Sequence, residues 1–348
     1  HDDINYKIYK YINVLDIEIL LTPLDRTADL EQRYKKAEPL CNYLDTKNKY
    51  KDSILFYRLG DFYEMFFDDA ITVSRELELT LTGKDCGQEE RAPMCGIPYH
   101  AADNYIAKLI GKGYKVAICE QLEDPKQAKG IVKRDVIRVV TPGTVMESNL
   151  LEEKKNNYIM SIFKTGIFFG IAICDISTGD FYASEIKDTN NFLKLLDEIS
   201  RFSPAEIIAN DMMTSSLQEI AKIKERFDLY ISKQDESNFI EEFDNLELNY
   251  DFISEKNEKI KNLKEKAVMV CAINGLLRYL KDTQKTKLDH IHRIKVYETT
   301  KYMALDVNAR RNLELIEKMR DKTKKGTLLW VLDKTLTSMG GRLLRRWI

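Results

Sequence analysis

Residues 58–70, RLGDFYEMFFDDA, interleave four aromatic rings with four acidic groups around a Gly-Asp turn. Aromatic rings are usually buried and carboxylates usually exposed, so this mixture has two interpretations. Either the stretch opens an ordinary buried helix, or one ring is held outward with an acid beside it, which would make a binding site. Phe62 is the candidate ring, because it directly follows the Gly60-Asp61 turn, and Glu64 is the neighbouring acid.

Other chemistry finds little support in the sequence. The Gly-Lys pairs at 83–84 and 111–112 lack the upstream glycine of a phosphate-binding loop, and there is no G-x-S-x-G nucleophile elbow. The six cysteines are scattered without a C-x-x-C pair and the four histidines are dispersed, so we expect no metal site. Cysteines inside apolar stretches, such as Cys95 and Cys174, suit a reducing cytoplasm.

The elements around the candidate site indicate a mixed α/β part at 38–145. SILFYRL is typical of a strand, and apolar residues at 62, 63, 66, 67 and 70 predict an amphipathic helix after it. In that helix Asp61 would be the cap, and Tyr63, Phe66 and Phe67 would belong to the core. Further along, the patterns predict a strand at 76–83, a helix within 100–114, and strands within 115–122 and 135–143.

Two further parts follow a polar linker at 146–157. Residues 158–263 begin with three strands joined by Lys-Thr-Gly and Ser-Thr-Gly turns and continue as helix, strand, helix, strand, an order that resembles the ribonuclease-H-like fold. From 264 to 348 the pattern turns helical, opening with a long buried helix at 265–284. The last residues, RLLRRWI, carry no helix stop signal, so we expect the chain to be a piece of a longer protein.

A ribonuclease-H-like part raises the alternative of a metal-dependent nuclease, whose paired cations need several carboxylates. Asp175 stands where a first-strand acid would fall. Of the following strands, one offers only Glu185 near its end, and the next offers only Glu206 at its start. We therefore interpret Asp175 as shaping the turn DISTG.

Composition indicates a soluble globular class, with 44% hydrophobic and 32% charged residues. No apolar run approaches the ~20 residues that cross a bilayer, so we expect no membrane association. The net charge is −2, and residues 46–145 hold fifteen basic and fifteen acidic side chains, which predicts a weak electrostatic hold on nucleic acid. Basic residues do gather at the end, with seven against two acids in residues 321–348.

The segment SILFYRLGDFYEMFFDDA resembles the mismatch-recognition domain of the MutS family of bacterial DNA mismatch repair proteins. The resemblance continues through CDISTGDF, which is similar to the family's connector domain, and through YLKDTQKTKLDHI, RRNLELIE and TLLWVLDKTLTSMGGRLLRRWI, which are similar to its helical core. It covers roughly 38 to 348. Residues 1–37 do not match the family's usual short N-terminal arm, and we treat them as an unmatched extension.

The resemblance implies that Phe62, Tyr63 and Glu64 form the family's Phe-x-Glu element, which reads mispaired or unpaired bases in double-stranded DNA. A mispaired step bends and opens more cheaply than its neighbours, so an apolar wedge entering from the minor groove kinks it selectively. Phe62 would be the wedge, and its ring can stack on any base. Glu64 would repel a well-paired duplex and would exchange a hydrogen bond with a displaced base, with either partner carrying the proton.

The resemblance also places basic or polar groups near DNA at Lys84 and Arg138, although each could equally be a solvated surface charge. Arg58 lies inside the strand and would brace the turn. The resemblance further implies a homodimer, downstream partners such as MutL, and a cytoplasmic, nucleoid-associated location. The ATP and Mg²⁺ chemistry of the family would belong to an ATPase domain outside this chain, so we expect no catalytic activity. MutS relatives that handle recombination branches lack the Phe-x-Glu element, so GDFYE argues against that third possibility.

Overall fold

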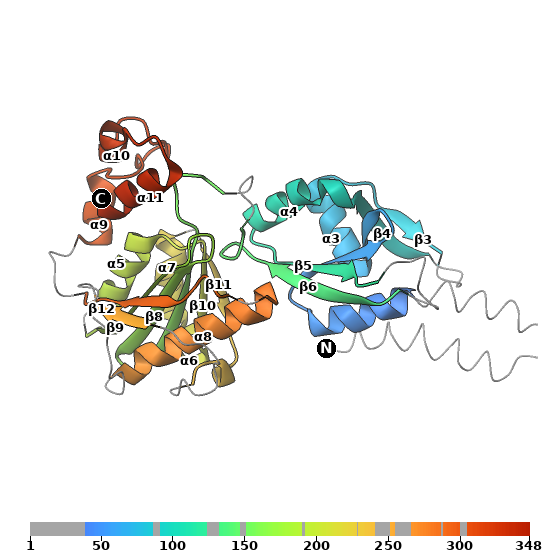
Figure 1. Cartoon of the computed structure of the whole chain (residues 1–348), viewed down its shortest axis with the longest axis horizontal. Helices are drawn as coiled ribbons and strands as arrows, with labels where there is room; N and C mark the ends of the chain where they lie inside the picture. The colour runs from blue at the N-terminus through green and yellow to red at the C-terminus, as the bar shows by residue number, and fades with distance from the viewer. Residues whose placement is uncertain are drawn as a thin grey trace, which may run out of the picture. The chain divides into compact units, whose positions relative to one another are not determined.

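The computed structural model divides into two compact units at Thr141/Pro142 (Figure 1). It describes residues 39–85, 91–123, 132–146, 151–189, 192–227, 229–240, 251–254, 266–286, 288–299 and 305–348. The unmatched extension 1–37 lies outside these residues. Both units combine a mixed sheet with helices, which confirms the predicted multi-domain α/β class.

The first unit is built on a six-stranded sheet in the order β3-β4-β2-β1-β5-β6. Only β1 and β5 pair in parallel, and the other neighbours are antiparallel. The strands are β1 (Ile54–Leu59), β2 (Phe62–Phe66), β3 (Thr82–Lys84), β4 (Ala92–Pro98), β5 (Val116–Gln121) and β6 (Arg134–Val140).

Helices cover both faces of this sheet, with α3 (Phe67–Leu77) and α4 (Ala102–Gly111) on one face and the helix at 39–49 on the other (Figure 1). The helix at 39–49 packs Leu40 and Tyr43 into a buried cluster with Leu55 and Phe66. The Tyr43 and Phe66 rings meet edge to face with their centroids 5.0 Å apart.

A buried carboxylate fixes the junction between β2 and α3. Asp69 accepts hydrogen bonds from the Tyr43 hydroxyl at 2.7 Å, the Lys47 ammonium at 2.8 Å and the Leu55 backbone N–H at 3.0 Å. A buried carboxylate with three donors is well satisfied, so the end of β2 is held rigidly against β1 and the helix at 39–49.

The predicted helix beginning at residue 62 is wrong in its first turn, because residues 62–66 form β2 and α3 begins at Phe67. Pairing with β1 and β4 on both sides overrides the helical spacing. Asp61 therefore caps no helix, and its carbonyl instead accepts the Tyr99 backbone N–H at 3.0 Å. The strand predicted at 76–83 is also too early: α3 continues to Leu77, and β3 starts at Thr82.

The second unit contains a seven-stranded sheet in the order β11-β10-β7-β8-β9-β13-β12. Its first three strands form the predicted antiparallel meander, and β10 and β11 extend it in parallel. The strands are β7 (Tyr158–Thr165), β8 (Phe168–Asp175), β9 (Asp180–Lys187), β10 (Glu206–Ala209), β11 (Tyr230–Lys233), β12 (Asp251–Ser254) and β13 (Arg293–Val296).

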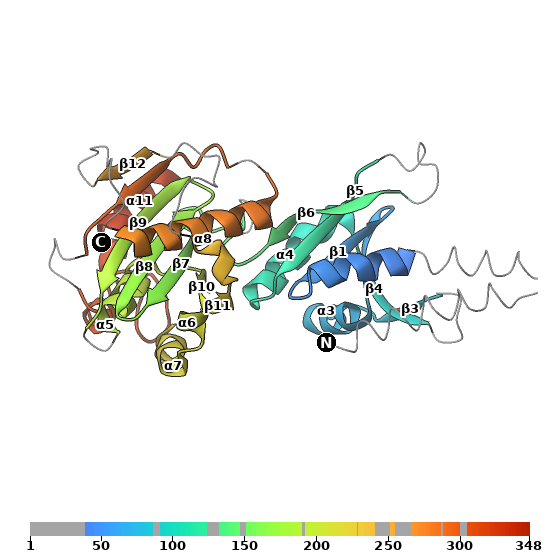
Figure 2. The same ribbon diagram turned by 90° about the horizontal axis from the view of Figure 1, so that it is seen from below.

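The long helix predicted at 265–284 exists as α8 (Ala267–Gln284), but it does not open a separate helical part. It packs across the sheet, and its Met269, Ile273 and Leu276 share one buried core with Ile159 of β7 (Figure 2). After α8 the chain returns to the sheet as β13, beside β9. The connector-like fold therefore extends well past the predicted boundary at 264.

The opposite face of this sheet carries shorter helices. Leu195, Leu196 and Ile199 of α5 pack with Ile223 of α7 against the β7 side chain Met160. These helices are α5 (Leu193–Phe202), α6 (Asp211–Thr214) and α7 (Leu217–Arg226). None of the helices that the structure describes is long and apolar enough to span a membrane.

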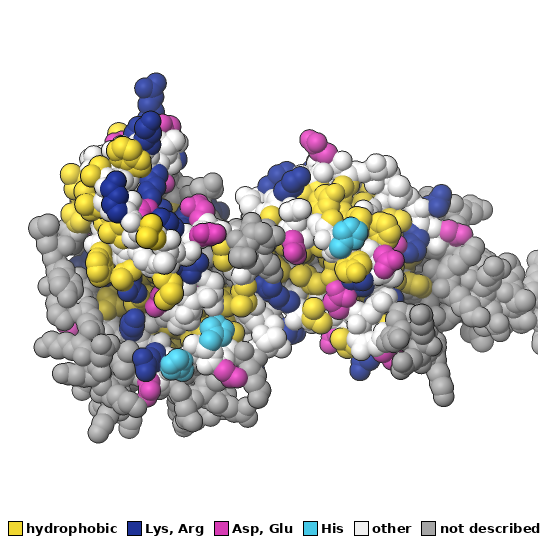
Figure 3. Space-filling model, turned by 45° about the horizontal axis from the view of Figure 1, so that its top comes forward, with side chains coloured by type: hydrophobic (Ala, Val, Ile, Leu, Met, Phe, Trp, Pro, Cys, Tyr) yellow, Lys and Arg dark blue, Asp and Glu magenta, His cyan; other side chains and the backbone are white. Residues whose placement is uncertain are grey.

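The end of the chain forms three short helices, and it exposes many apolar side chains over α10 and α11 (Figures 1 and 3). Trp330, Leu336 and Met339 are examples, with Leu336 99% exposed. These helices are α9 (Val307–Asn312), α10 (Leu328–Leu332) and α11 (Ser338–Trp347).

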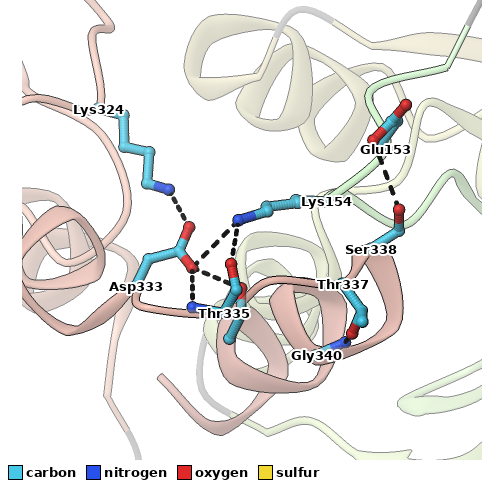
Figure 4. A network of polar contacts seen from close by, with 8 residues as sticks. All are labelled: Glu153, Lys154, Lys324, Asp333, Thr335, Thr337, Ser338 and Gly340. Atoms are coloured by element: carbon cyan, nitrogen blue, oxygen red, sulfur yellow. Dashed lines mark hydrogen bonds and ion pairs between the residues drawn. The ribbon is translucent and has the colours of Figure 1, made fainter.

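A polar network ties the predicted linker to this end segment (Figure 4). Lys154 donates to the Thr335 carbonyl at 2.8 Å and lies 3.5 Å from a carboxylate oxygen of Asp333. Asp333 also pairs with Lys324 and accepts the Thr335 hydroxyl. The hydrogen bond from Lys324 is the main cause that holds the pKa of Asp333 well below its usual range.

Candidate nucleic-acid interface

Phe62 lies at the start of β2, directly after a tight turn between β1 and β2. Leu59 pairs with Phe62, so Gly60 and Asp61 alone make the turn, and Gly60 adopts a φ of +60° that suits glycine. The Phe62 ring is 46% exposed, whereas Tyr63 is 7% exposed and Phe66 is fully buried. The predictions that Phe62 points outward and that its aromatic neighbours belong to the core agree with the structure.

Glu64 and Lys84 form an ion pair beside Phe62. Alternation along β2 puts Glu64 on the same face as Phe62, and the Lys84 ammonium of β3 reaches its carboxylate at 2.5 Å. Gly96 of β4 pairs with Glu64. Because glycine has no side chain, the space beside Glu64 and Phe62 stays open. A β-carbon at Gly96 would lie in this space, 3.7 Å from the Glu64 Cγ and 3.9 Å from the Phe62 ring.

The ion pair is partly exposed and therefore exchangeable. The Glu64 side chain is 18% exposed and the Lys84 side chain 30% exposed. Pairs in such settings contribute on the order of 1 kcal/mol or less, so a base or a phosphate could replace either partner. Two of the predicted DNA-contacting groups thus neutralise each other in the free protein.

Arg58 braces the turn, as predicted, and also contacts an exposed aromatic ring. Its Nε donates to the Gly60 carbonyl at 2.5 Å, and its guanidinium stacks 3.7 Å from the centroid of the Tyr99 ring. Tyr99 is 44% exposed. Sequence reasoning missed Tyr99. The signal that could have found it is an aromatic residue directly after Pro98, and Pro98 of β4 pairs with Phe62 of β2.

The opposite face of the hairpin is locked by Tyr63. Its hydroxyl donates a hydrogen bond to Glu120, whose carboxylate also lies 3.6 Å from Arg58. Burial is the main cause that raises the pKa of Tyr63, so the phenol remains a neutral donor. This contact fixes the Tyr63 side chain on the face of the hairpin opposite to Phe62.

Arg138 is not brought to this site. Glu64 and Cys119 both pair with Tyr57, so they lie on the same face of the sheet. Ile118, next to Cys119 in β5, points to the opposite face. Arg138 pairs with Ile118 and therefore lies on that opposite face. Arg138 also lies three strands from β2, which is about 14 Å at ordinary strand spacing.

Arg134, which sequence reasoning missed, lies on the same strand as Arg138 but on the Glu64 face of the sheet. It sits where β6 pairs with the last residue of β5, Gln121, and its Nε donates to the Arg58 carbonyl at 2.7 Å. Its guanidinium lies 5.4 Å from the Tyr57 ring centroid, on the Glu64 face of the sheet. Lys84 and Arg134 are thus two basic groups that the described strands place on this face.

Asp175, the centre of the nuclease alternative, shapes its turn as predicted. It is fully buried and accepts hydrogen bonds from the Ser177 N–H at 2.9 Å, the Ser177 hydroxyl at 2.7 Å and the Asn156 amide at 2.7 Å. Glu206 is likewise engaged, by the Tyr279 hydroxyl at 2.6 Å. Within the described residues no three His, Cys, Asp or Glu side chains are grouped to hold a metal ion.

We expect Asp175→Ala to destabilise the second unit by about 2–3 kcal/mol, because it removes a buried acceptor that several partly buried donors share. Urea unfolding followed by circular dichroism would measure this loss. Asp180→Ala, on the exposed side of the same turn, is the matched control and should change stability by less. Equal stability of the two variants would contradict the structural role of Asp175.

Comparison with known proteins agrees with this architecture. The models for MutS domain I, MutS domain II and MutS domain III match residues 39–149, 157–292 and 308–348. The second range contains α8, in accord with its packing on the sheet.

Curated relatives match most of the chain. It is 59% identical over 307 residues to the DNA mismatch repair protein MutS of Ruminiclostridium cellulolyticum and 57% identical over 309 residues to that of Acetivibrio thermocellus. These alignments cover 88% of the chain and 35% of each relative, so the chain spans about a third of their length. The three consecutive domain matches and this identity establish that the chain belongs to the MutS family.

Proposed function

We propose that this chain recognises mispaired or unpaired bases in duplex DNA by inserting the Phe62 ring from the minor groove. The observation that carries the proposal is the half-exposed Phe62 ring on a rigid hairpin, beside an exchangeable Glu64–Lys84 pair. Family membership supports a role in mismatch repair, as the names of the relatives state for those proteins.

The hairpin suits a wedge because its other contacts are already satisfied. Arg58 fixes the turn and Tyr63 is bound to Glu120, whereas the Phe62 ring is half-exposed and free to gain contacts. Unstacking one base step costs a few kcal/mol, and less where pairing is already lost. Stacking of the ring on a base returns roughly 1–3 kcal/mol, so insertion is favourable only where the step is weakened.

The Glu64–Lys84 pair adds discrimination by partner exchange. When DNA approaches, Lys84 turns to a backbone phosphate and releases the Glu64 carboxylate. At a well-paired step that carboxylate meets only negative potential, which opposes binding. At a mispaired step the carboxylate forms a hydrogen bond with the displaced base, and this bond replaces its lost contact with Lys84.

The remaining functions of the family enter as expectations for the longer protein. The sequence lacks a P-loop, so we propose that ATP and Mg²⁺ bind in the part of the relatives that this chain does not span. Dimer formation, contact with MutL, and a cytoplasmic, nucleoid-associated location belong to the same proposal.

The proposal is tested by fluorescence anisotropy of this chain with G·T and fully matched duplexes at low salt. We expect weak binding with a measurable preference for G·T. Glu64→Gln should bind matched DNA several-fold more tightly, because it removes the repulsion, and should lose about tenfold in discrimination. Asp103→Asn removes an exposed acid from α4, on the other face of the sheet, and serves as the control. If the two variants gained equally for both duplexes, Glu64 would act only through net charge.

A further inference from the structure

A cavity of about 730 Å³ lies in the second unit, between α5 and the end segment that contains α9 and α11. Its volume falls in the range of small-molecule sites. Ten of its lining residues are lysine or arginine, and Glu317 is the one acid among them in the part of the chain that the structure describes. No step of mismatch recognition uses this cavity.

Two of its arginines are partly buried and have no salt-bridge partner among the described residues. Arg345 of α11 keeps its buried Nε without a hydrogen-bond partner. Arg310 of α9 lies near a second cation, Arg201 of α5, and burial together with this repulsion lowers the pKa of Arg310. Partly buried, clustered cations are unfavourable unless an anion joins them.

The acids around the cavity leave this excess of positive charge in place. Glu198 is shared between the Tyr297 hydroxyl at 2.6 Å and Arg201 at 3.6 Å. Asp180 lies 3.8 Å from both Lys295 and Arg346, at the long end of ion-pair distances. Glu198 and Asp197 attract Arg310 through space, but neither forms a salt bridge to it among the described residues.

One wall of the cavity is aromatic. The Phe202 ring lies 5.5 Å from Tyr158 and 6.0 Å from Tyr297, and the Arg201 guanidinium lies 5.1 Å from the Tyr297 centroid. Trp347 of α11 also lines the cavity and is 75% exposed. Aromatic faces beside arginines suit a ligand that has both a planar ring and negative charge.

We propose that this cavity binds a nucleotide, with its phosphates on Arg201 and Arg310 and its base against the aromatic lining. The volume fits one such ligand, whereas a single strand of nucleic acid needs a groove that runs along several nucleotides. Inorganic polyphosphate shares the charge but has no ring, and therefore serves as the comparison ligand.

The test is isothermal titration of this chain with ADP, pyrophosphate and a short single-stranded oligonucleotide. ADP should bind one to one and more tightly than pyrophosphate. Arg310→Gln and Arg201→Gln should each weaken ADP binding about tenfold, as expected for loss of a charged hydrogen bond. Arg320→Gln is the matched control, because Arg320 is exposed in the same segment, does not line the cavity, and should leave binding unchanged.

Thermal unfolding without ligand separates binding from folding. Arg310→Gln should change the unfolding temperature little, since it removes a repulsion with Arg201 together with attractions to Glu198 and Asp197. Absence of ADP binding, equal affinity in Arg310→Gln and Arg320→Gln, or loss of folding in Arg310→Gln would overturn the site. Pyrophosphate binding as tight as ADP would overturn the nucleotide assignment, and so would a preference for the oligonucleotide.

Discussion

Phe62→Ala should remove the preference for mismatched over matched DNA. The ring supplies the stacking that offsets the opening of a weakened step, and this stacking is worth roughly 1–3 kcal/mol, or about 5- to 150-fold in the affinity ratio. Affinity for matched DNA should change little, because the ring does not enter a well-paired duplex. Anisotropy titrations with G·T and matched duplexes measure both quantities.

Stability and a second exposed ring provide the controls for this variant. Phe62 is half-exposed, so Phe62→Ala should leave the unfolding temperature of the first unit nearly unchanged. Tyr99→Ala removes a similarly exposed ring on the adjacent strand end and should reduce affinity for both duplexes without changing their ratio. An unchanged ratio in Phe62→Ala, or an equal loss in Tyr99→Ala, would remove Phe62 from the recognition role.

Gly170→Ala should destabilise the second unit by about 3 kcal/mol or more, as severe overpacking does. A β-carbon on Gly170 of β8 would lie 1.9 Å from the Val268 carbonyl oxygen and 3.0 Å from the Met269 Cα. Both are backbone atoms, so α8 as a whole would have to move away from the sheet. Both tryptophans of the chain, Trp330 and Trp347, lie in this unit, so tryptophan fluorescence during urea unfolding reports its stability.

Gly111→Ala is the control for adding a methyl group to a glycine, and because Gly111 lies in the first unit its unfolding is followed by circular dichroism. Gly111 ends α4, has no atom within 4 Å of an added β-carbon, and does not require a positive φ, so alanine there should be neutral or slightly stabilising. If Gly170→Ala were as well tolerated as Gly111→Ala, α8 would not pack on the connector sheet, and the boundary that the sequence predicts at 264 would stand.

The sequence predicts most strands because their apolar runs are bounded by clear turns. The meander of β7, β8 and β9 is an example, since the Gly166 and Gly179 turns both adopt a positive φ. The error at β2 has a physical cause. Apolar residues at 62, 63, 66, 67 and 70 satisfy a helical period, but β2 pairs with β1 on one side and with β4, about thirty residues away, on the other, which makes 62–66 a strand.

The site was predictable only in part. The exposure of Phe62 follows from its position after a two-residue turn, which is local information. The pairing of Glu64 with Lys84 depends on the register of β2, β4 and β3, and the sequence treats the two residues as independent candidates. The same applies to Arg138, since its face follows from strand pairings that no local pattern reveals.

The central claim is that the Phe62 ring physically enters the duplex at a weakened step. A duplex with 2-aminopurine next to the mispaired base tests this directly, because its fluorescence changes when local stacking changes. At saturating protein, we predict a clear change for the unaltered chain and none for Phe62→Ala on the same duplex. The same fluorescence change with both proteins would show that the base is displaced without the ring, and would contradict the account.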